Sequence, residues 1–480
     1  MPIRYILDDV VKIYAFGKKR TKDNLIASLF WGDKIEVSAD ETKAILPSFQ
    51  WNEAKKKYDV IKREGAIPEK ARLGESPGVL KVRFLDVGQG DAAMIETPKG
   101  RFILLDGGEE RHLRRYVAAA FAHLFKTGPL DVAAIVVSHG DADHFAGLTK
   151  LVQGRREGNE PMVCANRVFH NGLVKGTKTT ANEAFGATKK VDGVAYATEL
   201  EDDLRTVPEA RMNAPFKAWA AALKALRTID GKKPKMERLE YGDGGKFEFL
   251  DDEHIKVEVL GPSVEEIGGK PALRLLHTPG TRSLSASHTI NGHSVVLRLV
   301  YGNVRFLFGA DLNEESEERL LERARAEGVS LASEVLKVPH HGSADFSPAT
   351  LEAIRAVVSV VSSGDESETK EYIHPRAGLV GALGKYSRPS VTKPLIYVTE
   401  MVAFFKRIGP AMVTPLEGRS KTASRFSNVY NKSVFGIVHV RTDGSRVLVA
   451  TPSGKADQKE AYAFTVSASG EIAFGDVNLA

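Results

Sequence analysis

Apolar and polar positions along this chain fall into two alternating patterns, which predict a mixture of strands and helices. Short β-branched runs such as LDVAAIVV (130–137) have the length and composition of buried strands. The segment FKAWAAALKALRTI (216–229) instead has the spacing of an amphipathic helix. Strand pairs and helices follow one another through the middle of the chain, so the pattern predicts an α+β fold with several sheets.

The same patterns place further elements. The predicted strand segments are 80–97, 101–108, a hairpin over 246–262, two strands over 293–312, and 357–365. The predicted helices are 114–126, 316–328, 347–356 with Ser347 as its N-cap, and an exposed, charged helix over 49–65.

Breaker residues and changes of pattern divide the chain into three predicted parts. A small β-rich module (1–76) ends at GESPGVL, where Gly and Pro interrupt the pattern. The central domain (77–385) contains the strand pairs and helices, with a polar, weakly periodic insertion or lid over 164–208. The C-terminal region (386–480) has the alternation and the Asp-Gly turn of a β-meander.

Composition excludes several classes of protein. The 480 residues are 42% hydrophobic and 27% charged, as in soluble globular proteins, and the net charge of +5 permits an anionic substrate without requiring one. A single cysteine, Cys164, excludes a disulfide framework and a multi-cysteine zinc finger. No apolar run is long enough for membrane insertion, and the first residues lack a secretion signal, so we expect a cytoplasmic protein.

Histidine and aspartate residues gather at the ends of three predicted strands. The loop VSHGDADHFAGL (137–148) directly follows a strand and places two histidines and two aspartates within six positions. Asp311 follows the strand VRFLFGA, and His340–His341 follow EVLKVP. Strand ends that lie side by side converge on one face, and imidazole with carboxylate suits Zn or Mn in a dinuclear hydrolytic site.

Each cluster by itself also has an ordinary structural explanation. A His-x-Asp loop forms Asx turns, Asp311 is suited to N-cap the following helix, and a His-His pair can lie in a helix-entry loop. The coincidence of three clusters at three strand ends favours the metal site.

The strand-end motifs resemble the metallo-β-lactamase superfamily. SHGDADHFAGL resembles its signature loop, and the Asp at position 141, where most members have His, makes it similar to the hydrolase module of the competence protein ComEC. Residues 84–108, 291–312 and 336–343 resemble further motifs of that module, and 362–375 is a looser match. The resemblance covers roughly 79–385 and implies a four-layer αββα sandwich.

The resemblance implies two divalent ions, Zn or Mn, and a set of ligands. Asp311 is implied as the bridging carboxylate, and His340 is preferred over His341 as the ligand of the two-histidine turn, with His341 behind it. Asn291 and Ser294 fit the Asn-x-x-Ser pattern of ComEC-like chains, but His293 between them is also a candidate. The candidate ligands are His139, Asp141, Asp143, His144, Asp311, His340 or His341, and Asn291 or His293.

Three residues have other implied roles. Asp143 is a candidate catalytic residue as well as a ligand. His374 is either a catalytic histidine that protonates a leaving oxygen or a helix cap beside Pro375, and the two roles are equally supported. Asp106 is predicted to be structural and to anchor the metal loop through hydrogen bonds.

The implied reaction is hydrolysis in which a dinuclear metal site activates water. A phosphodiester fits best, which makes the chain a nuclease or phosphodiesterase with nucleic acid as its partner, although DNA uptake does not carry over because the chain lacks ComEC's membrane channel. Hydrolysis of a small ester, lactone or thioester on the same scaffold is an alternative, and so is a non-catalytic binding or regulatory protein. Basic residues that could meet phosphates, or could equally be solvated surface charges, are Lys99, Arg101, Arg298 and Arg376.

Overall fold

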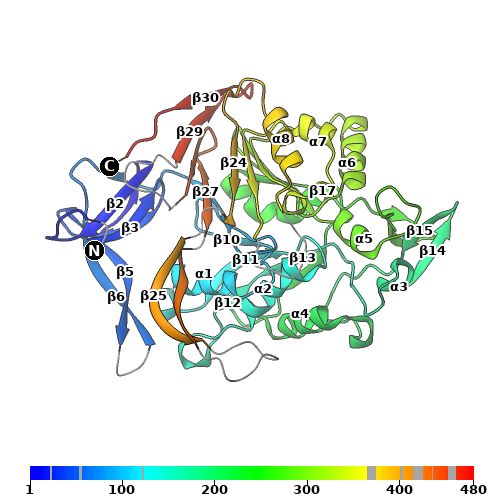
Figure 1. The fold of residues 1–480 in the computed structure, drawn as a ribbon, viewed down its shortest axis with the longest axis horizontal. Coiled ribbons are helices and arrows are strands. Elements are labelled where there is room, and N and C mark those ends of the chain that lie inside the picture. Colours follow the sequence, from blue (N-terminus) through cyan, green and yellow to red (C-terminus); the bar gives the residue numbers. More distant parts are fainter. Residues whose placement is uncertain are drawn as a thin grey trace.

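The computed structural model contains both helices and several sheets, which confirms the predicted mixture (Figure 1). It describes residues 1–21, 24–52, 57–121, 124–364, 374–400, 404–413, 425–434, 436–451 and 461–479.

The largest sheet has 11 strands and contains the predicted strands around the histidine-rich loop. Strands β10, β11, β13 and β16 run parallel, so their carboxyl ends lie at one edge of the sheet. In spatial order the strands are β16 (Lys235–Arg238), β13 (Arg167–His170), β11 (Leu130–Val136), β10 (Phe102–Leu105), β9 (Ala93–Glu96), β8 (Leu80–Leu85), β27 (Ile437–Thr442), β28 (Arg446–Ala450), β29 (Ala461–Val466) and β30 (Ile472–Gly475), with β12 (Val163–Ala165) beside β11.

A second sheet of six strands contains the strands that precede Asp311 and the two-histidine turn. From β21 onward its strands are parallel, which again brings carboxyl ends to one edge. Its order is β17 (Ile255–Gly261), β20 (Val296–Tyr301), β21 (Val304–Phe308), β22 (Val335–Lys337), β23 (Val358–Val361) and β24 (Leu395–Val398).

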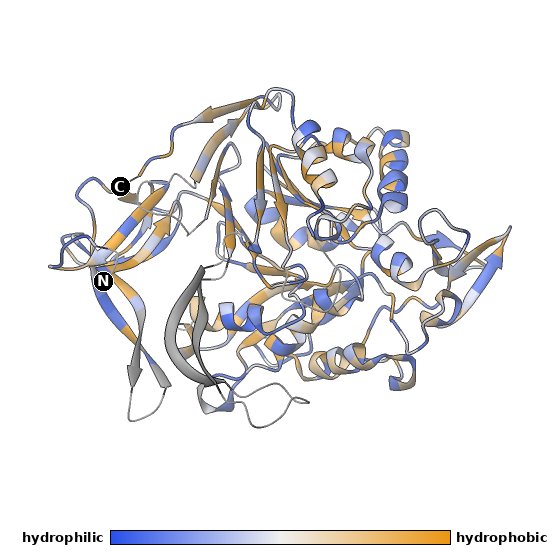
Figure 2. Ribbon diagram, in the orientation of Figure 1, coloured by the Kyte–Doolittle hydropathy of each residue, from blue (hydrophilic) through white to orange (hydrophobic). Residues whose placement is uncertain are grey.

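Apolar residues pack between the two sheets and on the outer face of each. Phe84 and Val136 of the larger sheet share one buried cluster with Phe306 and Val358 of the smaller sheet. Figure 2 shows hydrophobic residues along these strands and a largely hydrophilic α6 on the outside. The larger sheet is covered by α1 (His112–Ala120), α2 (Ala142–Val152) and α4 (Ala214–Ala225), and the smaller by α6 (Glu314–Ala326), α7 (Pro348–Ile354) and α8 (Ala377–Lys385).

The observed helix ends agree with the predicted ones where a capping residue marks the end in the sequence. The Ser347 side chain accepts a hydrogen bond from the Thr350 backbone N–H at 3.3 Å, which confirms the predicted N-cap of α7. The predicted helix 114–126 begins two residues earlier and ends at Ala120, followed by a 3₁₀ turn over Leu124–Lys126. Residues 122–123 of that prediction lie outside the described residues.

The predicted charged helix over 49–65 is wrong. The segment forms parts of two paired strands, β5 (Lys43–Asn52) and β6 (Lys57–Ala66), with Trp51 opposite Tyr58, while residues 53–56 lie outside the described part. Pairing with neighbouring strands overrides the helix propensity of its Lys and Glu residues. The N-terminal sheet has the order β3 (Leu25–Phe30), β2 (Val10–Ala15), β6, β5, β4 (Lys34–Val37), β1 (Ile3–Ile6) and β7 (Leu73–Gly74).

The predicted hairpin over 246–262 is also wrong in its first half. Residues Asp243–Glu253 form a 3₁₀ helix, and only the second half is a strand, β17. Phe247 and Leu250, three residues apart, are both buried, and buried Glu253 accepts a hydrogen bond from the Thr97 hydroxyl at 2.9 Å. In so short a segment, the spacing of apolar residues does not distinguish a 3₁₀ helix from a strand.

The C-terminal region contributes strands to both sheets. β24 completes the six-stranded sheet, and β27 pairs with β8, which connects the predicted β-meander to the larger sheet. Residues 452–460, between two strands of that meander, lie outside the described part. A further hairpin consists of β25 (Phe404–Val413) and β26 (Arg425–Val434).

The 164–208 segment is only partly an insertion. Its first residues supply β12 and β13, and then β14 (Thr188–Val191) and β15 (Val194–Ala197) form a four-stranded sheet with β18 (Glu265–Glu266) and β19 (Pro271–Arg274). Figure 1 shows this hairpin at the far end from the N-terminus. Two short helices, α3 (Ala181–Ala184) and α5 (Ala286–Gly292), contact each other beside it.

No helix among the described residues has both the length and the apolar character needed to cross a bilayer.

Candidate metal centre

The histidine-rich loop lies between β11 and α2 and is fixed by Asp106, which follows the neighbouring parallel strand β10. Asp106 Oδ1 accepts a hydrogen bond from the Ser138 backbone N–H at 2.7 Å, and Oδ2 accepts one from the Ser138 hydroxyl at 2.6 Å. Asp106 is 1% exposed and adopts a φ of 56°, a conformation that aspartate tolerates better than most residues. These hydrogen bonds confirm its predicted anchoring role.

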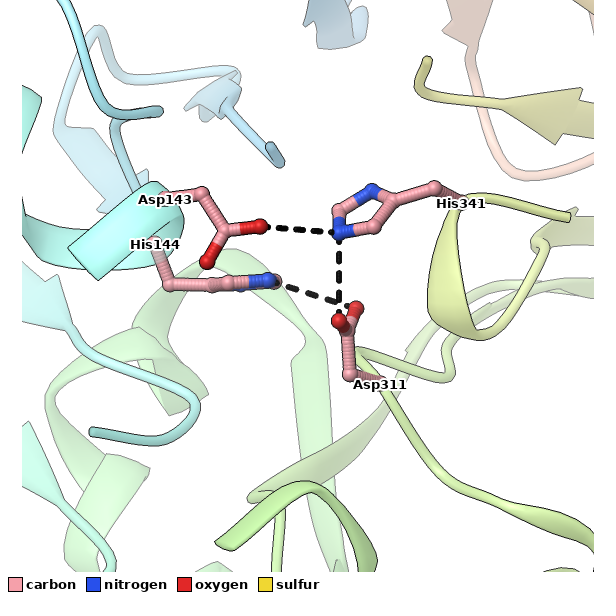
Figure 3. A group of neighbouring side chains, drawn as sticks. All are labelled: Asp143, His144, Asp311 and His341. Atoms are coloured by element: carbon pink, nitrogen blue, oxygen red, sulfur yellow. Dashed lines mark ion pairs between the residues drawn. The ribbon is translucent and has the colours of Figure 1, made fainter. Parts of the chain in front are cut away.

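Four of the predicted ligands converge from three strand ends (Figure 3). His341 Nε2 lies 3.3 Å from an oxygen of Asp143 and 3.1 Å from Asp311 Oδ2, and His144 Nε2 lies 3.3 Å from Asp311 Oδ1. Asp311 thus lies between the two histidines. Both histidines and Asp311 are at most 3% exposed.

The hydrogen bonds behind the two histidines fix the direction of each ring. His144 Nδ1 lies 2.9 Å from Asp106 Oδ2, and His341 Nδ1 lies 3.0 Å from the Ser362 backbone carbonyl. The Nε2 atoms therefore point into the cluster, where neither they nor Asp311 Oδ1 hydrogen-bonds to any described residue. Buried ring nitrogens that lack a hydrogen bond, face carboxylates and are backed by such partners are typical of metal-binding histidines, so the donor set fits a divalent ion.

The charges of the cluster depend on one another in the metal-free protein. Burial raises the pKa of the Asp311 carboxyl, but His341 and His144 outweigh burial and hold that pKa well below its usual range. Burial lowers the pKa of His144, but Asp311 and Asp106 outweigh it and hold that pKa well above its usual range. A metal ion bound at Nε2 would displace these protons.

Sequence reasoning missed a buried ion pair beside the cluster. The Lys337 ammonium contacts Asp91, donates a hydrogen bond to the Ala310 carbonyl at 2.8 Å, and lies 3.9 Å from Asp311 Oδ1. Asp91 Oδ1 lies 3.3 Å from His341 Nδ1. The available signals were an Asp directly after GQG and a Lys within the apolar strand that precedes the two histidines.

Asp91, Asp106 and His144 form a second group with ligand-like spacing. The Lys337 ammonium already supplies a cation to Asp91, and Asp106 already binds Ser138 and His144. This group therefore supports the cluster through charge and hydrogen bonds.

The remaining residues of the loop lie around the cluster. The His139 ring centroid is 4.0 Å from that of His144, and His139 is 1% exposed. Asp141 Oδ1 lies 2.5 Å from Lys175 Nζ, so an ion pair holds this carboxylate. Burial raises the pKa of Asp141, and Lys175 opposes part of that effect.

Asn291, rather than His293, lies at the site. In the amide orientation that satisfies its neighbours, Asn291 Nδ2 donates to Asp141 Oδ2 at 3.1 Å and its oxygen accepts from His340 Nε2 at 3.3 Å. His293 Nε2 instead donates to the Arg274 carbonyl at 2.6 Å, and neither ligand group includes it.

In the two-histidine turn, His341 rather than the preferred His340 lies in the described cluster. His341 joins Asp143 and Asp311, whereas His340 contacts Asn291 and its ring lies 6.2 Å from that of His374. His374 is half-buried, and burial lowers its pKa to about 4. Residues 365–373, which precede it, lie outside the described part.

The basic residues suggested for phosphate contacts are mostly paired elsewhere. Lys99 and Arg101 both pair with Asp252, and Arg298 pairs with Glu258 at 2.5 Å. Arg376 precedes α8 and is exposed.

Comparisons with known proteins agree with this geometry in part. Residues 85–158 match the sequence profile of the metallo-beta-lactamase superfamily. The match includes the histidine-rich loop, Asp91 and Asp106, whereas Asp311 and His341 lie beyond it and reach the cluster through the fold.

Among solved structures, a similar one is described as Tm1679, a metal-dependent hydrolase of the beta-lactamase superfamily. It is 12% identical, covers 67% of this chain and 96% of its own, and has a TM-score of 0.31, too low to support an argument. The comparison with curated proteins finds no match.

Proposed function

We propose that this chain is a metal-dependent hydrolase of phosphodiester bonds, built on a four-layer αββα sandwich. The observation that carries the proposal is the cluster itself: two imidazole nitrogens and a carboxylate oxygen, all buried, face one another without hydrogen bonds to described residues. Burying such groups together is costly unless ring protons or a metal ion supply positive charge between them. The superfamily match over 85–158 supports hydrolysis, and the resemblance of the strand-end motifs to the ComEC module favours a phosphodiester.

Two sets of residues would hold the ions. The group around His144 and His341 would hold one ion, and the other loop residues with Asn291 would hold a second beside the shared Asp311. Imidazole and carboxylate ligands together suit Zn or Mn. The first set is Asp143, His144, Asp311 and His341. The second set would be His139, Asp141, Asn291 and Asp311, in which Asn291 contacts Asp141.

When bound, the metal ions supply an activated water and neutralise charge on the phosphate. The chain's own residues keep this site in shape. Asp106 and the Ser362 carbonyl orient the two ligand rings, and Lys337 keeps a fixed positive charge beside Asp91 and Asp311. His374, next to His340, would donate a ring N–H to the leaving oxygen.

The test uses protein stripped with a chelator and reloaded with Mn²⁺ or Zn²⁺. We expect hydrolysis of bis(p-nitrophenyl) phosphate, and of DNA or RNA in single- or double-stranded form, only after reloading. Asp311→Asn should abolish it, because one carboxylate oxygen becomes an amide nitrogen. His293→Gln is the matched control, since His293 is buried nearby but binds a backbone carbonyl.

Two results would overturn the proposal. In the first, the protein holds about two metal ions and hydrolyses an ester, lactone or thioester but no phosphodiester. The proposed substrate class would then be wrong. A protein that binds no metal would be a non-catalytic binding or regulatory protein.

A further inference from the structure

A groove of about 920 Å³ runs beside the metal centre. One wall is the loop 175–180 of the 164–208 segment, and the other is the turn and helix start over 278–287. Backbone hydrogen bonds hold the first wall: Gly176 N–H donates to the Ala184 carbonyl at 2.7 Å, and Asn213 N–H donates to the Lys175 carbonyl at 2.9 Å. These hydrogen bonds anchor the start of the loop at Lys175 and Gly176.

The lining of this groove is basic and rich in hydroxyl groups. Lys175, Lys178 and Arg282 line it with several Thr and Ser side chains, and no carboxylate is among its described lining residues. Lys178 and Arg282 are exposed, and neither forms an ion pair with a described carboxylate. In contrast to Lys99, Arg101 and Arg298, these two cations are available to an anionic ligand.

Two contacts connect the groove to the metal centre. Lys175, on its first wall, lies 2.5 Å from Asp141 of the histidine-rich loop. Asn291, which contacts Asp141 and His340, donates its second amide hydrogen to the Ser287 carbonyl on the opposite wall at 3.3 Å. Both walls of the groove are therefore one contact away from candidate ligands of the metal centre.

The far side of the 277–281 turn has the opposite charge. A smaller groove of about 390 Å³ there is lined by Glu314, Glu315, Glu318 and Asp345. Thr278 lines both grooves, so the turn separates a basic surface from an acidic one. An anionic chain is attracted to the first surface and repelled by the second.

We propose that the basic groove binds the sugar–phosphate backbone of a nucleic acid and guides it to the metal centre. Lys178 and Arg282 contact phosphates, and the hydroxyl groups contact phosphate or sugar oxygens, so the contacts position the strand without reading its sequence. This assigns a role to the 164–208 segment. The inference rests on the proposed phosphodiesterase function and specifies its substrate as a polymer.

The test compares two double variants with equal loss of charge. Lys178→Ala/Arg282→Ala removes the two available cations of the groove, and Lys189→Ala/Lys190→Ala removes two exposed lysines of β14 in the same segment. Binding of fluorescein-labelled single-stranded and duplex DNA is measured by anisotropy, in EDTA to prevent cleavage, over a series of salt concentrations.

We expect the groove variant to bind single-stranded DNA about tenfold more weakly or worse, with a log–log salt slope smaller by about 1.4, because each phosphate contact contributes about 0.7. The β14 variant should match the wild type. Equal binding by both variants, with unchanged far-UV circular dichroism, would overturn the inference.

Failure of the proposed function would look different. It would appear as a wild-type protein, reloaded with metal, that leaves bis(p-nitrophenyl) phosphate intact, whereas failure of the groove would leave that hydrolysis in place. A groove variant that loses duplex binding but keeps single-stranded binding would contradict the expected result.

Discussion

Two pairs of buried histidines in this protein differ in what their Nε2 atoms face. His144 and His341 each bind a fixed acceptor through Nδ1 and direct Nε2 into a cluster without a hydrogen-bond partner among the described residues. His170 and His293 each donate from Nε2 to a backbone carbonyl, of Asp202 at 3.2 Å and of Arg274 at 2.6 Å. All four are at most 6% exposed.

The comparison teaches that burial and residue type do not identify a metal ligand. A histidine whose Nε2 donates to a carbonyl is satisfied as a neutral ring, and burial lowers the pKa of His170 and of His293 to about 4. A histidine whose second nitrogen faces carboxylates gains from a cation in between. The surroundings of Nε2 therefore separate the candidate ligands His144 and His341 from His170 and His293.

The largest expected effect is on metal affinity, which should differ strongly between His341→Gln and His293→Gln. His341→Gln removes a nitrogen that faces two carboxylates, so metal affinity should fall by more than about 100-fold and diester hydrolysis should be lost. His293→Gln should keep its metal, because an amide can also donate to the Arg274 carbonyl. Metal content after dialysis, with hydrolysis rates, checks both; equal metal loss would break the comparison.

The next effect concerns the fixed cation of the cluster. Lys337→Met leaves Asp91 buried without its partner and should lower the free energy of unfolding by about 3–5 kcal/mol. Lys175→Met is the control. Its ion pair with Asp141 is partly exposed, so its loss should lower the free energy of unfolding by about 1 kcal/mol or less. Urea unfolding of the metal-free proteins measures both, and similar midpoints would contradict the distinction.

A smaller effect is expected from the partner behind His144. Asp106→Asn removes the charged acceptor of His144 Nδ1 but leaves the ring in place, so metal affinity should weaken by about 10- to 100-fold. Competition with a chromogenic chelator gives this affinity. An unchanged affinity would mean that the direction of the ring is fixed by packing alone.

The smallest effect is a pH dependence of a structural histidine. His170 has a folded pKa of about 4, below its unfolded value of 6.5, so its stabilising effect is complete above pH 6.5 and is lost as the pH falls toward 4. The stability difference between wild type and His170→Gln should therefore shrink by about 1 kcal/mol between pH 7 and pH 5.5. Urea unfolding at both pH values checks this, and a constant difference would be the contrary result.

Local signals predicted the parts of the fold that depend on local chemistry. The run 130–137 became β11 because its β-branched residues suit a buried strand, and Ser347 capped α7 because its hydroxyl reaches a free N–H. The segment 49–65 failed because its Lys and Glu residues favour a helix in isolation, while its strand pairing depends on neighbours distant in sequence.

By itself, the sequence determined the residue types of the site and the strand ends that carry them. Chain order and periodicity already bring Asp143, His144 and Asp311 to carboxyl ends of strands. Only the tertiary structure decided that His341, rather than His340, meets those residues. It also decided that Asn291, rather than His293, contacts Asp141, and that Lys337 lies beside Asp91. These choices depend on the direction of each side chain and on contacts between distant segments. The sequence shows neither of these for two candidates that are only one or two positions apart.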